Sequence, residues 1–156
     1  MFQIVNHRLA GLPYVPSPNC GGRIEPTLIV LHDTADRLRP DDTISWFKDP
    51  KSKVSAHFVV ARDGSVTQMV PCDRAAWHAG KSSWKGRASC NNFAIGIEID
   101  NPGKLTRVGD YAVAWFGEKF PLTQCVELST PEHGKGWWLR YTDAQLDTVR
   151  QLIRVL

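Results

Sequence analysis

His32 and Glu98 are the two residues whose types and positions could do chemistry together. His32 follows the apolar residues 28–31 in the segment LIVLHDTA, and Glu98 interrupts the apolar segment AIGIEID. An unpaired buried carboxylate is costly, so a glutamate inside an apolar strand is expected either to be salt-bridged or to be kept for a task. A histidine and a carboxylate facing one cleft suit a zinc hydrolase, in which the metal acidifies a water molecule and the carboxylate removes its proton.

Each of these residues also has a purely structural explanation. A lone histidine at a strand end can be a core residue satisfied by a backbone carbonyl, and Glu98 can be paired with an arginine or a lysine at the sheet edge. Three other histidines, His57, His78 and His133, show no HxH or HxxH spacing, so spacing alone gives only a weak indication of a metal site. The four cysteines show no CxxC spacing and are expected to be buried thiols.

Both candidate residues are expected on strands of one sheet. The run TLIVLH is continuous, apolar and rich in β-branched residues, which predicts a central strand covered on both faces. NNFAIGIEID predicts a neighbouring strand, in which Gly96 indicates close approach by a backbone or a ligand. Alternation puts Glu98 on the face of Gly96 and Asp100, with isoleucines on the other face. His32 stands at the carboxyl end of its strand, where ligands gather in open α/β sheets.

Three further elements follow from local patterns. Residues 40–50 predict a short helix with Asp41 or Asp42 as its N-cap. Residues 54–71 predict a β-hairpin around Asp63-Gly64. Residues 142–156 predict an amphipathic helix that begins with a capping box of Thr142 and Gln145. Its apolar face is expected to hold Leu146, Val149, Leu152, Ile153 and Leu156.

The segment 102–138 interrupts this order and is interpreted as an insertion. It contains a possible second hairpin and the aromatic residues Trp115, Phe116, Trp137 and Trp138. These side chains could shape a substrate cleft or cover an oligomer face, and the sequence does not choose between the two.

Composition sets the class of protein. With 156 residues, 42% hydrophobic and 22% charged, the chain is expected to form one soluble domain. Its alternating strand and helix patterns predict mixed α/β structure. A net charge of +3 without a basic run and interleaved aromatics argues against nucleic acid as a partner. No window approaches the ~20 apolar residues of a membrane span, and no secretory signal is visible. A cytoplasmic location is therefore expected, or release to the cell wall by a signal-less route.

Three segments carry a resemblance to a known family. LIVLHDTA, KVSAHFVVARDGSVTQMVPCDRAAWHAGKSSWKGRASCNNFAIGIEID and YTDAQLDTVRQLI resemble the zinc-dependent N-acetylmuramoyl-L-alanine amidases, a group shared with phage lysozyme-type amidases and peptidoglycan recognition proteins. The likeness is greatest to the bacterial anhydro-muropeptide amidases. It runs from about residue 13 to the C-terminus, apart from the insertion, with its motifs in the family's order.

The resemblance implies a fold, a cofactor and a reaction. It implies a mixed β-sheet flanked by helices, one zinc ion, and hydrolysis of the amide between N-acetylmuramic acid and L-alanine in peptidoglycan or muropeptides. His32 matches the first zinc ligand, and Glu98 matches the acid/base carboxylate. The same resemblance implies substrate-binding roles for four residues: Lys53 near the peptide carboxylates, Trp77 and His78 in the cleft, and Arg87 as an anion contact.

The chain also departs from the family pattern. The family's other zinc ligands lie beyond the final helix, in a segment resembling GHxxIxPxRKxDPGP, and this sequence ends before it. Residues 1–156 are therefore expected to form a single amidase-like domain that lacks its C-terminal segment, with His133 as a conceivable replacement ligand. Ala56 stands where phage members carry a tyrosine, and the anhydro-muropeptide branch also lacks that tyrosine. Three hypotheses follow: a muramoyl amidase, a zinc-free muropeptide-binding module, or an inert truncated chain. The oligomeric state is not predicted.

Overall fold

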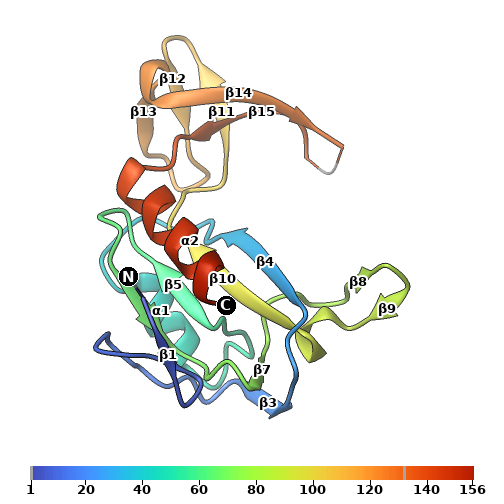
Figure 1. Ribbon diagram of the computed structural model, residues 1–156. Coiled ribbons are helices and arrows are strands. Elements are labelled where there is room, and N and C mark those ends of the chain that lie inside the picture. The colour runs from blue at the N-terminus through green and yellow to red at the C-terminus, as the bar shows by residue number, and fades with distance from the viewer. Residues whose placement is uncertain (1, 132) are drawn as a thin grey trace.

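The first sheet is mixed and carries both candidate residues. The computed structural model describes residues 2–131 and 133–156. The strand order is β4 (Leu28–Asp33), β10 (Ala94–Ile99), β5 (Phe58–Val60) and β6 (Val66–Gln68). β10 is parallel to both β4 and β5, whereas β5 and β6 form the antiparallel hairpin expected around Asp63-Gly64. The expected mixed sheet is thereby confirmed (Figure 1).

The two helices cover this sheet. Ile95, Ile97 and Ile99 pack with Val149 and Leu152 of α2 (Asp143–Val155) in the main core, as alternation along β10 predicted. On the other face, α1 (Asp42–Lys48) contributes a smaller cluster that includes Phe47 and Val59. Since Val59 pairs in register with Glu98, the candidate carboxylate faces the side of the sheet on which α1 lies.

Smaller elements complete this part of the chain. Three two-stranded ladders and a 3-10 helix surround the first sheet: β1 (Ile4–Val5) with β2 (Arg8–Leu9), β3 (Cys20–Arg23) with β7 (Arg74–Ala76), β8 (Ser83–Trp84) with β9 (Arg87–Ala88), and η1 (Cys90–Asn92). Within the described ranges, neither helix is long and apolar enough to cross a membrane.

Three details of the first sheet and its helices differ from the sequence prediction. β4 is an edge strand rather than a central one, and Leu31 is accordingly 48% exposed. An apolar run indicates a strand but does not set its place in the order. Asp41 precedes α1 in the left-handed region, and its side chain makes no cap hydrogen bond. The capping box of α2 is confirmed, but Ile153 and Leu156 are exposed rather than part of the buried face.

The segment that the sequence analysis interpreted as an insertion forms a second sheet instead of a single hairpin. Its antiparallel strands lie in the order β13 (Lys119–Pro121), β12 (Tyr111–Val113), β11 (Lys104–Val108), β15 (Gly134–Leu139) and β14 (Cys125–Thr130), with η2 (Leu122–Gln124) before β14. It has its own core of Leu105, Ala112, Ala114, Phe120, Cys125 and Leu139. Figure 1 shows this sheet as a separate lobe beyond α2 and β4. Its two ends meet where the Asn101 side chain donates to the Leu139 carbonyl at 2.9 Å.

Candidate active site

The parallel register of β4 and β10 brings His32 and Glu98 side by side. His32 pairs directly with Glu98, and two residues earlier Val30 pairs with Gly96. Since alternate residues share a face, Gly96 leaves a gap on the face of Glu98, and the His78 ring fills it. A Cβ atom at position 96 would lie 2.4 Å from Cγ of His78. The close approach expected at Gly96 is therefore made by a side chain, not by a backbone or a ligand.

Hydrogen bonds hold His78 against His32. The backbone N–H groups of His78 and Ala79 both donate to Asn91 Oδ1, at 3.1 and 2.8 Å. His78 Nδ1 lies 2.9 Å from His32 Nε2, and His78 Nε2 lies 3.4 Å from the Ala94 carbonyl oxygen. A proton on His78 Nε2 would serve Ala94, and Nδ1 would then accept from His32. In that tautomer the lone pair of His32 is on Nδ1.

Burial keeps both imidazoles neutral. Burial lowers the pKa of His78 to about 4, with a smaller contribution from the neighbouring His32, and burial also lowers the pKa of His32. A neutral imidazole retains a lone pair that can bind a metal or accept a proton. His57, by contrast, is the satisfied core histidine of this chain: its Nε2 contacts the Arg74 carbonyl at 2.9 Å and its Nδ1 accepts from Gly96 N–H at 3.0 Å.

Glu98 is buried without the salt bridge that was its structural explanation. It is 9% exposed, and its Oε2 has no hydrogen-bond partner among the described residues. Burial is the main cause that raises the pKa of Glu98 to about 8, with smaller contributions from the negative charges of Asp33, Asp36 and Asp100. A carboxyl group held in this way favours a role in proton transfer over a purely structural one.

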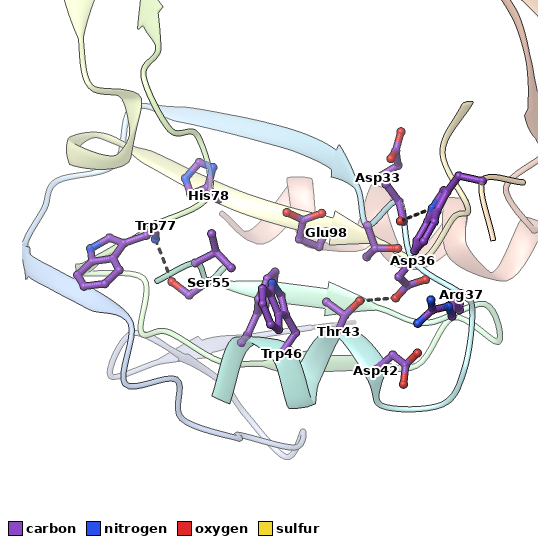
Figure 2. A pocket seen from close by; sticks show the side chains of 15 residues that line it. Asp33, Asp36, Arg37, Asp42, Thr43, Trp46, Ser55, Trp77, His78 and Glu98 are labelled. Atoms are coloured by element: carbon purple, nitrogen blue, oxygen red, sulfur yellow. Dashed lines mark hydrogen bonds between the residues drawn. The ribbon is translucent and has the colours of Figure 1, made fainter. Parts of the chain in front are cut away.

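A cavity of about 570 Å³ opens over this group. Figure 2 shows Glu98 between two ends of the cavity, with His78 and Trp77 at one end and Asp33, Asp36 and Arg37 at the other. Trp46 of α1 and Ser55 lie along its floor, where Ser55 Oγ accepts from the Trp77 backbone N–H at 2.9 Å (Figure 2). At the far end, the Asp36 carboxylate accepts from Leu38 N–H and from the Thr43 hydroxyl.

The other sequence-predicted residues lie outside the cavity wall. Lys53 is exposed and directly precedes Val54 and Ser55, which line the cavity. Arg87 lies with its guanidinium 3.8 Å from the Phe93 ring centroid, and its Nη1 donates to Thr27 Oγ1 at 2.9 Å. His133 follows β14, and its carbonyl accepts from the Lys104 ammonium at 2.6 Å.

Trp46 lines the cavity and escaped the sequence analysis, whereas Trp115 was named there only among four aromatic residues that could shape a cleft or cover an oligomer face. Trp46 had a signal, because the helical pattern buries Thr43 and Phe47 and leaves Trp46 off that face. Trp115 had no comparable signal beyond its aromatic type, since its position depends on how the second sheet packs.

The donor set around His32 does not complete a zinc site within the described residues. A catalytic zinc takes three protein ligands and keeps a further position for water. In residues 2–131 and 133–156, no group of three or more His, Cys, Asp or Glu side chains is placed to hold a metal ion. His32 is therefore a single candidate ligand, and His133 does not join it in such a group.

Comparisons with known proteins show which family the chain resembles. The profile of the family Amidase_2, N-acetylmuramoyl-L-alanine amidase, matches residues 22–156. The 1,6-anhydro-N-acetylmuramyl-L-alanine amidase AmpD of Escherichia coli K12 is 37% identical over 118 residues, which cover 62% of this chain and 63% of that protein. AmpD of Enterobacter cloacae is 35% identical over 138 residues, covering 76% of this chain and 72% of the relative.

Solved structures show the same fold. The crystal structure of a selenomethionine derivative of AmpD superimposes with a TM-score of 0.61 at 30% identity, covering 96% of this chain and 75% of that one. The Escherichia coli amidase AmiD, solved with anhydro-N-acetylmuramic acid-L-Ala-D-γ-Glu-L-Lys, superimposes with a TM-score of 0.58 at 22% identity, over 98% of this chain and 50% of that one. The family profile covers most of the chain, so the protein belongs to the N-acetylmuramoyl-L-alanine amidase family.

Proposed function

We propose that this protein hydrolyses the amide bond between N-acetylmuramic acid and L-alanine in a muropeptide. The observation that carries the proposal is Glu98, a buried carboxyl in the wall of a cavity that His78 shares, with one oxygen that has no partner among the described residues. Family membership and the amidase activity of the AmpD relatives support this choice of bond. The chain spans 63% of the length of the Escherichia coli relative, and the activity of the whole protein is part of the proposal.

The chemistry assigned to Glu98 is proton transfer. Its carboxylate, the form that predominates above the raised pKa of about 8, would take a proton from the attacking water as the water oxygen bonds to the lactyl carbonyl carbon. The same carboxyl would give that proton to the alanine nitrogen as the C–N bond breaks, so that an acid and an amine are released. The low polarity that burial gives this site strengthens each of these interactions relative to bulk water.

Zinc remains the proposed cofactor on the residue types of His32 and Glu98 and on the family resemblance, with His32 as its candidate ligand. The neutral state of His32 suits metal binding. Because the described residues bring no further pair of ligands to His32, the chemistry above uses only the side chains that the structure places at the site.

The proposed substrate contacts differ in their structural support. Trp77 and His78 line the cavity and would contact the substrate directly. Lys53, exposed beside the wall residue Val54, would attract the carboxylates of the stem peptide from the rim. Arg87 has the least support, because its guanidinium already contacts Phe93 and Thr27.

A second candidate function is muropeptide binding without hydrolysis. The incomplete donor set around His32 favours it, since a cavity with several exposed tryptophans can hold a ligand without a metal. Under this alternative, muropeptide binds with or without added zinc and is not cleaved.

The test compares wild type with Glu98→Gln on anhydro-N-acetylmuramic acid-L-Ala-D-γ-Glu-L-Lys in the presence of added zinc. Wild type should release a peptide with a free alanine amine, detected by mass spectrometry. The glutamine variant should turn over roughly two orders of magnitude more slowly, the usual scale for loss of a general base, while binding the substrate normally.

The matched control is Glu25→Gln, which removes an exposed carboxylate between β3 and β4 and should leave turnover unchanged. Equal turnover of wild type and Glu98→Gln would remove Glu98 from the mechanism. Binding by wild type without any cleavage would establish the second candidate instead.

A further inference from the structure

Trp115 belongs to the insertion but lies in the wall of the cavity that holds Glu98. It occupies the tight turn between β12 and β13, where Gly117 N–H donates to the Ala114 carbonyl at 2.9 Å. Its neighbours Ala114 and Phe116 pack into the core of the second sheet, so Trp115 projects away from that core. The insertion thus adds an aromatic side chain to the site of the first sheet.

The Trp115 ring is held in place although it is 63% exposed. Its indole N–H donates to the Ala35 carbonyl at 3.1 Å, which ties the turn to the loop that follows β4. The Phe116 ring packs edge-on against it at 5.2 Å, and the Arg37 guanidinium lies 5.1 Å from its centroid. With its polar atom satisfied and its orientation set, Trp115 presents a pre-ordered apolar surface to a ligand.

The charge around Trp115 selects the kind of ligand. This end of the cavity carries Asp33, Asp36 and Asp42 against the single cation Arg37. Among the described residues, no carboxylate lines the Trp77 end, and Lys53 lies beside it. An anionic stem peptide would be repelled from the Trp115 end, whereas a neutral ring with hydroxyl groups could donate hydrogen bonds to carboxylates there.

We propose that Trp115 is a sugar-binding platform, which packs its ring against a pyranose of the glycan part of the substrate. A pyranose combines an apolar C–H face, suited to an indole, with hydroxyl donors suited to the nearby carboxylates. The inference rests on the proposed function, because it takes a muropeptide as the ligand. It assigns the glycan to the Trp115 end and the peptide to the Trp77 end, and it makes the insertion a determinant of glycan recognition.

The experiment measures binding of the neutral N-acetylglucosamine trisaccharide by NMR titration of the full chain. Trp115→Ala should weaken binding about tenfold, as loss of a central aromatic contact typically does. Trp115→Phe keeps an aromatic face but lacks the indole N–H, so it should retain most of the affinity if stacking is the role. Trp84→Ala is the matched control, because Trp84 is 52% exposed and lies outside the cavity wall.

Several outcomes would overturn the inference. These are no trisaccharide binding by wild type, unchanged binding by Trp115→Ala, or equal losses in the alanine and phenylalanine variants, which would mark Trp115 as an anchor for the Ala35 loop. Trp115→Ala could also lose more affinity for the peptide L-Ala-D-γ-Glu-L-Lys than for the trisaccharide, each compared with wild type. That result would place the peptide at this end instead.

Hydrolysis, measured separately, distinguishes this inference from the proposed function. Cleavage by wild type together with unchanged trisaccharide binding by Trp115→Ala would reject the platform and keep the amidase. Loss of trisaccharide binding in Trp115→Ala without cleavage by wild type would keep the platform and reject the amidase.

Discussion

Glu98 lies in β10 and Asp100 directly follows that strand, and each has a buried carboxylate oxygen without a hydrogen-bond partner in the described part of the chain. Such groups lower the stability of a fold, because desolvation of a charge is not compensated. Glu98 faces the cavity with His78, so its cost is explained by the proposed proton transfer. Asp100 lies outside that cavity, so it lowers the stability of the fold in the same way but has no catalytic role.

Asp100 should make stability depend on pH. Burial is the main cause that raises the pKa of Asp100 from 3.8 to about 7. The negative charges of Asp36, Asp63 and Asp41 also raise it, and the positive charge of Arg62 lowers it. The pKa of this carboxyl is higher in the folded protein than in the unfolded chain. Its contribution to the free energy of unfolding is therefore fully present below pH 3.8 and is lost as the pH rises through about 7. The free energy of unfolding of Asp100→Asn should therefore match that of wild type near pH 4. At pH 8 it should be greater by about 1 kcal/mol, after allowance for solvent screening.

Urea unfolding at a series of pH values measures this difference. Asp110→Asn is the control, because Asp110 is exposed in the turn between β11 and β12, and its curve should follow that of wild type. Parallel curves for wild type and Asp100→Asn between pH 4 and pH 8 would contradict the assignment.

At the scale of elements, β10 organises the site because its two faces have different tasks. One face buries three isoleucines against α2, while the other presents Gly96 and Glu98. The parallel partner β4 adds His32 at the level of Glu98, and the missing side chain at Gly96 admits the His78 ring. The geometry of the two histidines thus depends on one glycine.

Gly96→Ala should displace His78. The new methyl group would lie within 3 Å of several ring atoms, so the ring must leave its position and the contact with His32 must break. We expect a destabilisation of about 1–3 kcal/mol, the usual cost of overpacking, together with a loss of muropeptide turnover. Thermal unfolding and the NMR signals of the His78 ring would report the two effects.

Gly22→Ala provides the matched control in strand β3, because a Cβ atom there would meet nothing within 4 Å. It should leave turnover and the His78 signals unchanged. Unperturbed His78 signals in Gly96→Ala would show that the ring does not need the gap.

At the scale of the whole molecule, the second sheet is joined to the first through a narrow connection. Its core is separate, and its entry and exit strands are paired at Lys104 and Trp138. It touches the site region where Leu38 packs against its core and where Trp115 bonds to Ala35. The lobe can therefore affect the cavity without forming part of the main core.

Replacing residues 104–138 by two glycines should leave a folded first sheet. The Asn101 side chain already holds the Leu139 carbonyl, so the new ends begin close together. Circular dichroism should show a cooperative melting transition. Its melting temperature should be lowered by roughly 5 °C, because the contacts of Leu38 and Ala35 are lost. Trisaccharide binding should fall as far as in Trp115→Ala, which is the control in the full chain. A shortened chain without a cooperative transition would show that the second sheet is required for folding.

The sequence by itself determined features that depend on neighbouring residues. Strand alternation separated Glu98 from the isoleucines of β10, Asp63-Gly64 marked the hairpin of β5 and β6, and Thr142 with Gln145 marked the start of α2. These patterns work because backbone periodicity and capping are set within a few residues. The assignment of His32 as the first zinc ligand came from the family resemblance, and its metal role stays a prediction.

Only the tertiary structure decided how distant segments meet. It placed β4 at the edge of the sheet, His78 over Gly96, and Trp115 against Ala35, which lies 80 residues earlier in the chain. An apolar run or an aromatic residue records that burial or contact is favourable, but not which surface supplies it. The partner surface is chosen by the packing of whole elements, and for Trp115 that choice brings the insertion to the cavity.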